Sequence, residues 1–143
     1  MTEWQDTVSV EAPELLPYLA AAADGRLLLP RCRACRRVQF PPRPTCRYCC
    51  WELFDWSDTP LVGSLYSWTV TRRAPLPSLQ DVVPYAVVVV ALDLPDLVRV
   101  VGRLEGYQEG QDLIPGERVV GQFVNAADSG EEGYPVLSWR LAR

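Results

Sequence analysis

Four cysteines in two close pairs constrain this chain more than any other feature of its 143 residues. Two residues separate Cys32 from Cys35, ten residues follow, and two residues again separate Cys46 from Cys49. A two-residue gap lets both thiolates of a pair reach one ion from a tight turn, and two such turns complete a tetrahedron. The spacing therefore predicts one structural metal ion, with zinc as the first choice, and no open coordination position for catalysis.

Other uses of the cysteines remain open at this point. Iron also suits an all-thiolate tetrahedral site, and would indicate a rubredoxin-like electron carrier. A redox-active dithiol is less favoured, because the sequence around the pairs lacks the βαβ pattern of thioredoxin-like proteins. The fifth cysteine, Cys50, is predicted to be a buried free thiol, with exchange for Cys49 as a metal ligand as the alternative.

The basic residues limit the chemistry that the chain can perform. It has no histidine, and all 14 of its basic residues are arginine. Catalysis through a Ser-His-Asp set, a Cys-His set or a lysine Schiff base is therefore excluded within this chain. Since the spacing also reveals no paired carboxylates, we expect no catalysis by the chain alone, and an enzyme in its own right is the weaker alternative.

The charges are unevenly distributed along a chain whose net charge is −4. The segment 26–51 holds seven arginines and no acidic residue, whereas all 18 carboxylates lie outside it. These arginines either offset the charge of a metal tetrathiolate or form a surface for phosphates or for an acidic partner. The candidate ligand-binding residues on such a surface are Arg33, Arg36, Arg37, Arg43 and Arg47.

The segment before the cysteines is predicted to be a short helix over residues 13–24. Its apolar residues recur near the helical period, and Gly25 is a natural stop. Pro17 lies in the first turns of this helix or sets its true start. The chain has no apolar run near the ~20 residues that span a bilayer and does not begin like a secretory signal. We therefore expect the reducing cytoplasm, where paired cysteines favour metal over disulfide.

Beyond residue 60 the pattern changes to strands with no long helix between them. Alternation and apolar runs predict five strands, over residues 63–73, 84–92, 97–104, 117–125 and 135–141. Five such strands favour a small antiparallel barrel of the OB-fold type. The run 84–92 is continuously apolar and predicts a strand covered on both faces.

Three details of this barrel bear on function. Tyr66, Trp68 and Val70 alternate with polar residues, which predicts one shared face for them, most simply in the core. Arg99 and Arg103 are predicted to share one face of their strand, with Val98 and Val100 on the other. The residues 74–83 form a long proline-containing loop, a place where function often resides, and residues 126–133 are predicted to be a hairpin loop.

The predicted fold is therefore mainly β, with a short N-terminal helix, a rubredoxin-like zinc ribbon and a five-stranded antiparallel OB-fold barrel. The expected divisions are an N-terminal segment over residues 1–25, the ribbon over 26–59 and the barrel over 60–143.

The sequence resembles the zinc-ribbon OB-fold proteins associated with acyl-CoA enzymes, catalogued as domain of unknown function 35. The resemblance covers nearly the whole chain and is most specific in the ribbon. One departure is Cys50, since the family usually has a small residue after the fourth cysteine. The segments that carry the likeness are DGRLLLPRCRAC at 24–35, VQFPPRP at 38–44, GSLYSWTV at 63–70, RAP at 73–75, PY at 84–85 and PGERV at 115–119.

This resemblance implies a non-catalytic accessory subunit in a hetero-oligomer with a thiolase-like acyl-CoA enzyme. Such an enzyme is a thiolase or a side-chain-cleaving aldolase, as in steroid degradation, and the accessory subunit would stabilise it and help form its acyl-CoA site. A hot-dog-fold enoyl-CoA hydratase is the alternative partner that the resemblance offers.

Functions of other classes remain as alternatives. An OB fold binds single-stranded nucleic acid by stacking bases on strand aromatics such as Tyr66 and Trp68 within a basic groove. The acidic barrel half argues against this use. A stand-alone acyl-CoA carrier is a further alternative, for which binding of acyl-CoA by the isolated chain would be the sign.

Overall fold

The structure is a computed structural model that describes residues 12–124 and 135–143. Its first elements are a 3-10 turn η1 (Pro13–Leu15), the helix α2 (Leu16–Ala23), and the strands β1 (Leu27–Cys32) and β2 (Phe54–Thr59). Helix α2 begins just before Pro17, which therefore sets the helix start, as one reading of the sequence expected. The predicted hairpin loop 126–133 lies outside the described residues.

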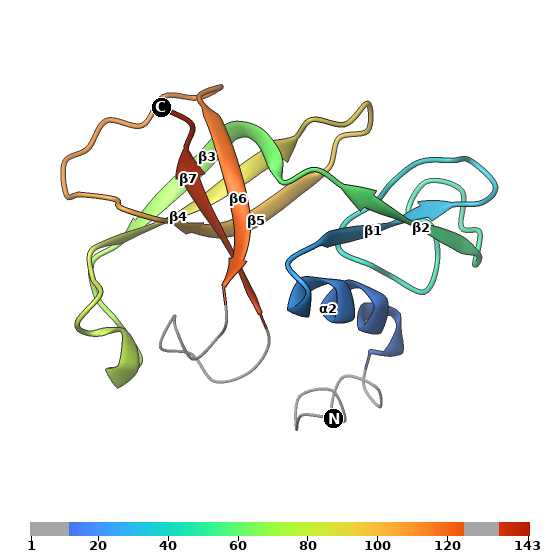
Figure 1. The fold of residues 1–143 in the computed structure, drawn as a ribbon, viewed down its shortest axis with the longest axis horizontal. Coiled ribbons are helices and arrows are strands. Elements are labelled where there is room, and N and C mark those ends of the chain that lie inside the picture. Colours follow the sequence, from blue (N-terminus) through green and yellow to red (C-terminus); the bar gives the residue numbers. More distant parts are fainter. Residues whose placement is uncertain (1–11, 125–134) are drawn as a thin grey trace.

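The remaining strands close into a barrel beside the ribbon (Figure 1). They are β3 (Val62–Thr71), β4 (Tyr85–Leu92), β5 (Arg99–Leu104), β6 (Arg118–Val124) and β7 (Val136–Leu141), with a 3-10 turn η2 (Pro77–Leu79) between β3 and β4. The mainly β class, the single short α-helix among the described residues and the closed five-stranded barrel are confirmed.

The barrel has the strand order β3-β4-β5-β7-β6, and one pair departs from the expected antiparallel arrangement. Strands β5 and β7 pair in parallel, with Arg103 opposite Ser138 and Leu104 opposite Trp139. A closed ring with an odd number of strands cannot reverse direction at every step, so one parallel pair is required. Here it joins the end of β5 to the middle of β7.

Strand β4 shows that the barrel is buried on one face only. Its residues alternate between half-buried and buried along the whole strand, with Ala86, Val88, Val90 and Leu92 in the core. The expectation of cover on both faces is therefore not met by the described residues, although the outward side chains are as apolar as the inward ones.

A β-bulge in β3 overturns the prediction that Tyr66, Trp68 and Val70 share a face. The register with β4 shifts between Leu65 and Ser67, so that Tyr66 is an extra residue and turns outward. Trp68 and Val70 pack against the core, as expected, but Tyr66 is half exposed. A bulge re-aims side chains in this way because two residues on one strand face a single residue on its neighbour.

The ribbon and the barrel share one hydrophobic cluster. Leu27 and Leu29 of β1 and Val38 lie in the same buried cluster as the core of the barrel. The backbone N–H of Val38 also donates to the Asp96 carboxylate, 3.0 Å away, in the turn between β4 and β5. The two parts therefore stabilise each other, and the division into segments 1–25, 26–59 and 60–143 stays a prediction.

Helix α2 packs at the junction between ribbon and barrel, where its Tyr18 contacts both. The ring of Tyr18 lies 5.7 Å from that of Phe40 in the ribbon and 6.0 Å from that of Phe123 in β6, measured between centroids. Burial raises the pKa of Tyr18 to about 12. Over the described ranges, no helix has both the length and the apolar character that crossing a membrane requires.

Candidate metal centre and its basic surface

The first cysteine pair lies in a tight turn at the end of β1. The N–H of Cys32 donates to the carbonyl of Arg37 at 2.9 Å, and the N–H of Arg36 donates to the carbonyl of Cys32 at 2.9 Å. Arg36 has a left-handed backbone with a φ of 66°. These two hydrogen bonds fold the chain back on itself, so that the thiols of Cys32 and Cys35 point to the same side.

The second pair repeats this turn. The N–H of Cys46 donates to the carbonyl of Trp51 at 2.7 Å, and the N–H of Cys50 donates to the carbonyl of Cys46 at 2.9 Å. Cys50 takes the left-handed backbone here, with a φ of 65°. The two turns thus have the same hydrogen-bond pattern, as the repeated two-residue spacing predicted, and they present Cys46 and Cys49 to the first pair.

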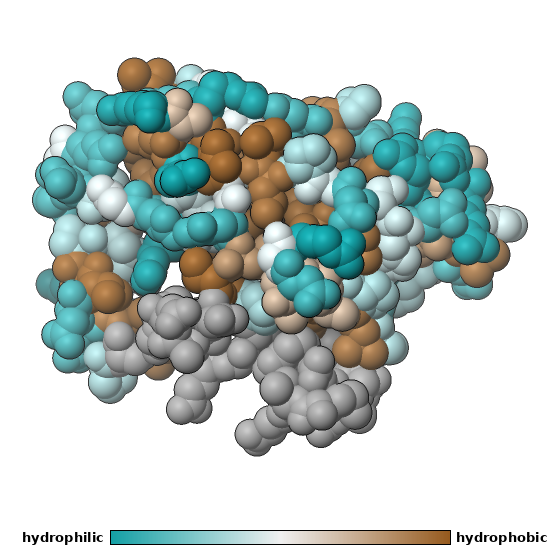
Figure 2. All heavy atoms as spheres, viewed as in Figure 1, coloured by the Kyte–Doolittle hydropathy of each residue, from teal (hydrophilic) through white to brown (hydrophobic). Residues whose placement is uncertain are grey.

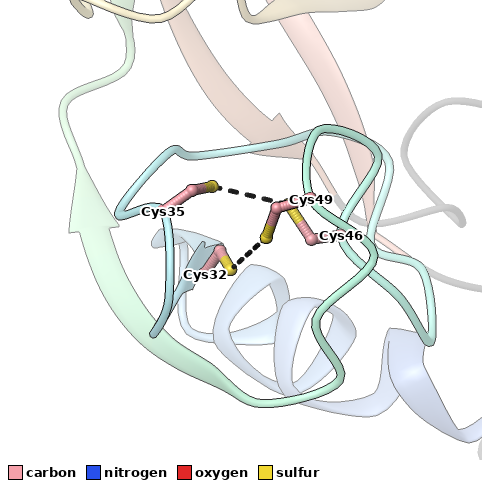
Figure 3. A group of neighbouring side chains, drawn as sticks. All are labelled: Cys32, Cys35, Cys46 and Cys49. Atoms are coloured by element: carbon pink, nitrogen blue, oxygen red, sulfur yellow. Dashed lines mark hydrogen bonds between the residues drawn. The ribbon is translucent and has the colours of Figure 1, made fainter.

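The four thiols meet in one cluster (Figure 3). The Sγ atoms of Cys32 and Cys49 are 3.5 Å apart, those of Cys35 and Cys46 are 3.7 Å apart, and all four lie within 4.8 Å of one another. A tetrahedral zinc with Zn–S bonds of ~2.3 Å requires sulfur atoms about 3.8 Å apart. The four cysteines are therefore positioned to bind one metal ion, and the predicted ligand set is brought together.

The backbone around the thiols favours negative charge at Cys32. Burial raises the pKa of Cys32, but N–H groups of Cys35 and Ala34 donate to its sulfur and the net effect lowers the pKa to about 7. At Cys49 the N–H of Trp51 lowers the pKa, but burial and the neighbouring thiols outweigh it and raise the pKa to about 11. A cation is therefore needed to hold Cys49 as a thiolate at neutral pH.

Cys50 is not the buried thiol that we expected. It is exposed, and its position in the turn requires a left-handed backbone, which favours glycine over any residue with a Cβ. The turn determines where the Cys50 side chain lies, because the hydrogen bond from its N–H to the carbonyl of Cys46 fixes the backbone at this residue.

Replacing Cys50 by glycine is expected to stabilise the protein and to leave its metal content at one ion. A non-glycine residue in the left-handed region costs ~1 kcal/mol, and glycine removes that cost. Cys50→Val is expected to lower stability instead, since a β-branched residue fits this backbone poorly. Thermal unfolding and zinc per chain measure both effects, and a loss of zinc in Cys50→Gly would show that Cys50 is a ligand.

One buried polar side chain supports the second turn and was not singled out from the sequence. Gln39 is buried, its Oε1 accepts from the N–H of Arg47 at 2.9 Å, and its Nε2 donates to the carbonyl of Thr45 at 3.3 Å. Its signal in the sequence is weak, because a single glutamine in a loop between cysteine pairs is an ordinary surface residue.

Two of the predicted arginines are engaged within the ribbon. The Nε of Arg33 donates to Asp55 Oδ1 at 2.9 Å, and the Nη1 of Arg36 donates to Asp55 Oδ2 at 3.0 Å. Hydrogen bonds from Arg36 and then Arg33 hold the pKa of the Asp55 carboxyl below its usual value. Both guanidiniums thus share one carboxylate that joins β2 to the first cysteine turn.

Other arginines of the ribbon are placed differently. The Cζ atoms of Arg37 and Arg47 lie 4.7 Å and 5.5 Å from the ring centroid of Tyr48, a residue of the second cysteine turn. Among the described residues neither they nor Arg43 form an ion pair. Arg37, Arg43 and Arg47 are exposed, at an end of the ribbon that carries mostly hydrophilic side chains in Figure 2.

Curated and solved proteins resemble this chain over different lengths. A probable enoyl-CoA hydratase alpha subunit of Thermomonospora curvata is 35% identical over 77 residues, which are 52% of this chain and 23% of that protein. The chain thus spans less than a quarter of this relative. A chain of an Ltp2-ChsH2(DUF35) aldolase has a TM-score of 0.75 and 26% identity, and the alignment covers 91% of this chain and 95% of that one.

A protein of unknown function of the DUF35 family from Sulfolobus solfataricus shares the fold, with a TM-score of 0.60, 12% identity and 96% of both chains covered. Two family models match the sequence itself: the rubredoxin-like zinc ribbon domain of ChsH2 over residues 19–53 and the C-terminal OB-fold domain of ChsH2 over residues 56–127. Taken with the four-cysteine centre and the closed barrel, these matches place the chain in the ChsH2 family of zinc-ribbon OB-fold proteins.

Proposed function

We propose that this chain is a non-catalytic accessory subunit of a thiolase-like acyl-CoA enzyme, in the class of side-chain-cleaving aldolases or thiolases. The observation that carries the proposal is the likeness to a chain of the Ltp2-ChsH2(DUF35) aldolase, which extends over almost the full length of both chains. The acyl-CoA class comes from the resemblance of the ribbon and barrel motifs. A cytoplasmic location, which the paired free thiols favour, belongs to the same proposal.

The chemistry of the chain supports a role without catalysis. Histidine and lysine are absent from its sequence. Among the described residues, the groups with shifted pKa values are Cys32, Cys35 and Cys49 of the metal site, the half-buried Tyr18 and surface groups held in ion pairs. A closed tetrathiolate site also leaves a metal no position for substrate. The reacting groups would therefore belong to the larger subunit, and the metal would hold the ribbon in shape.

The loop between β3 and β4 offers a contact with that subunit. It carries η2 and projects from the end of the barrel, away from the ribbon (Figure 1). Leu76 and Val82 are exposed on it, while Leu79 is buried and anchors it. We propose that this loop reaches the enzyme subunit and helps shape its substrate channel.

The ribbon arginines have two candidate roles within this function. Coenzyme A carries phosphates, and guanidinium forks bind phosphate oxygens well. Arg33 and Arg36 already share Asp55, so Arg37, Arg43 and Arg47 are better placed to bind the phosphates or an acidic surface of the enzyme.

Replacing Arg37 and Arg47 by glutamine is expected to raise the KM of the complex for acyl-CoA roughly tenfold, with little change in kcat. Each substitution removes one charged hydrogen bond to phosphate, and the free energy of that bond is discounted here because the arginines are exposed. Arg33→Gln with Arg36→Gln is the matched control, since it removes the same charge but breaks the contacts to Asp55. An unchanged KM in an intact complex would remove the phosphate role and leave contact with the enzyme.

A tagged copy of the chain, purified from native lysate, tests the proposed function. Recovery of a thiolase-like subunit near one-to-one, identified by mass spectrometry, is the expected result. Recovery of nucleic acid with no acyl-CoA enzyme would contradict it and favour the OB-fold binder, whose affinity for single strands falls with a slope of about −0.7 per phosphate contact in log salt.

An enoyl-CoA hydratase is the second candidate partner. The observation that favours it is the 35% identity to part of a probable enoyl-CoA hydratase alpha subunit. The same purification separates the two cases, because a hydratase subunit and a thiolase-like subunit give different peptides. Hydration of an enoyl-CoA by the recovered complex, without thiolase or aldolase activity, would select the hydratase.

A further inference from the structure

The outward face of three neighbouring barrel strands carries features that the metal centre does not explain. Strand β4 lies between β3 and β5 and pairs with both in antiparallel register. Directly opposite residues point to the same side of a sheet. The outward side chains therefore stand in three rows, Ser64–Ala91–Arg99, Ser67–Val89–Val101 and Thr69–Val87–Arg103.

The centre of this face is aliphatic. Val87 and Val89 of β4 are half-buried, and Val101 of β5 is 55% exposed. A strand with one face in water normally alternates apolar and polar residues, whereas a continuous apolar run is typical of strands covered on both sides. Among the described residues, α2 packs elsewhere, on β1 and through Tyr18 on Phe123 of β6.

Two arginine–tyrosine stacks flank the aliphatic centre. The Cζ of Arg99 lies 3.9 Å from the ring centroid of Tyr66, and the Cζ of Arg103 lies 5.8 Å from that of Tyr85. The bulge in β3 turns Tyr66 outward to make the first stack. Stacking holds each guanidinium plane while its N–H edge stays able to bind a carboxylate.

Neither arginine has a carboxylate of its own within the described ranges. Arg72 and Arg118, on the same barrel, are paired with Glu109 and Asp93, but no described ion pair includes Arg99 or Arg103. Covering a guanidinium without a counter-charge is costly. Whatever covers the valines must therefore bring carboxylates to the two stacks.

We propose that this barrel face docks the enzyme subunit, and that the subunit meets it with an apolar patch flanked by carboxylates. The face is defined by Tyr66, Val87, Val89, Arg99, Val101 and Arg103. The inference rests on the proposed function and names the surface that it uses. Tyrosine and arginine around an apolar centre are the composition of protein interfaces. A nucleic-acid strand fits less well, because the aliphatic centre offers no stacking platform and arginines already occupy the two rings.

Binding of the subunit recovered with the wild-type chain tests the face. Two variants are used, Val101→Glu and the double change Arg99→Glu with Arg103→Glu, and the equilibrium Kd is measured at about 150 mM salt. Each variant is expected to weaken binding at least ~10-fold. Val101→Glu buries a charge without a partner, and the double change places glutamates against the carboxylates of the enzyme subunit. Arg140→Glu, a single charge reversal of the same type at an exposed arginine of β7, is expected to stay within about twofold of the wild type.

Circular dichroism and zinc content establish that each variant is folded. A measurement on the wild-type chain needs no variant: hydroxyl-radical oxidation of Tyr66, which is half exposed in the free chain, is expected to fall several-fold in the complex. Unchanged oxidation of Tyr66, together with unchanged Kd values, overturns the proposed face and leaves the accessory function standing.

The remaining outcomes are also decisive. If the wild-type chain captures no acyl-CoA enzyme, the proposed function fails, and the docking proposal fails with it. If the variants instead lose binding to a labelled single-stranded 20-mer of dT, the face binds nucleic acid. If they convert a dimer of the free chain into a monomer, the face joins two copies. Either result overturns docking of the enzyme subunit.

Discussion

Cys46→Ser is expected to abolish stoichiometric zinc binding and to unfold the ribbon. Cys46 is buried, its Sγ is 3.7 Å from that of Cys35, and the N–H of Tyr48 donates to it at 3.4 Å. Structural zinc in small domains contributes on the order of 10–16 kcal/mol, which is as large as the whole stability of many domains, ~5–15 kcal/mol. A ribbon without the ion has little else to hold its two turns together.

The loss is also expected to reach the barrel, since Leu27, Leu29 and Val38 belong to the same hydrophobic cluster as its core. Zinc per chain, limited proteolysis and thermal unfolding measure these effects. Cys50→Ser is the matched control: it makes the same chemical change four residues away and is expected to retain one zinc. A Cys46→Ser chain with one zinc and an unchanged melting temperature would rule out the four-cysteine site.

The second large effect is expected at Trp139, which fills the interior of the barrel. Trp139 is fully buried, and two glycines on neighbouring strands make room for its ring. A Cβ at Gly121 would lie 2.8 Å from the Trp139 ring, and a Cβ at Gly102 would lie 2.7 Å from it. Trp139→Ala is expected to lower the free energy of unfolding by ~3–5 kcal/mol, measured by urea titration, whereas Trp51→Ala at an exposed position should change it little.

A double-mutant cycle separates the two glycines. Gly121→Ala is expected to cost ~1–3 kcal/mol through overpacking, and most of that cost should vanish when Trp139 is first replaced by leucine. Gly102→Ala should remain costly in both backgrounds, because its Cβ also meets the backbone oxygen of Leu137 at 2.5 Å. Equal costs for Gly121→Ala in the two backgrounds would contradict a direct contact with the tryptophan.

Local patterns in the sequence predicted the elements well. The two-residue cysteine spacing predicted both turns and the tetrathiolate cluster, because a turn of this kind needs only the hydrogen bonds within a six-residue segment. The five strands were predicted from alternation and apolar runs, since side chains of a regular strand point to opposite faces in turn. The family resemblance to ribbon and OB-fold proteins was confirmed in the same segments.

Contacts between distant residues could not be predicted in the same way. The role of Arg33 and Arg36 depends on Asp55, about twenty residues further along the chain, which β1–β2 pairing brings to the first cysteine turn. The bulge at Tyr66 depends on how β3 pairs with β4, and a shift of one residue reverses the face to which a side chain points.

The sequence by itself determined the metal site, the positions of the five barrel strands along the chain and the exclusion of histidine and lysine chemistry, because each depends on residue type and short spacing. Only the tertiary structure decided which arginines remain without a described carboxylate and that ribbon and barrel share a core. It also decided that Tyr66 joins Arg99 on an outward apolar face. These properties depend on closure of the barrel, which brings together residues that no local pattern relates.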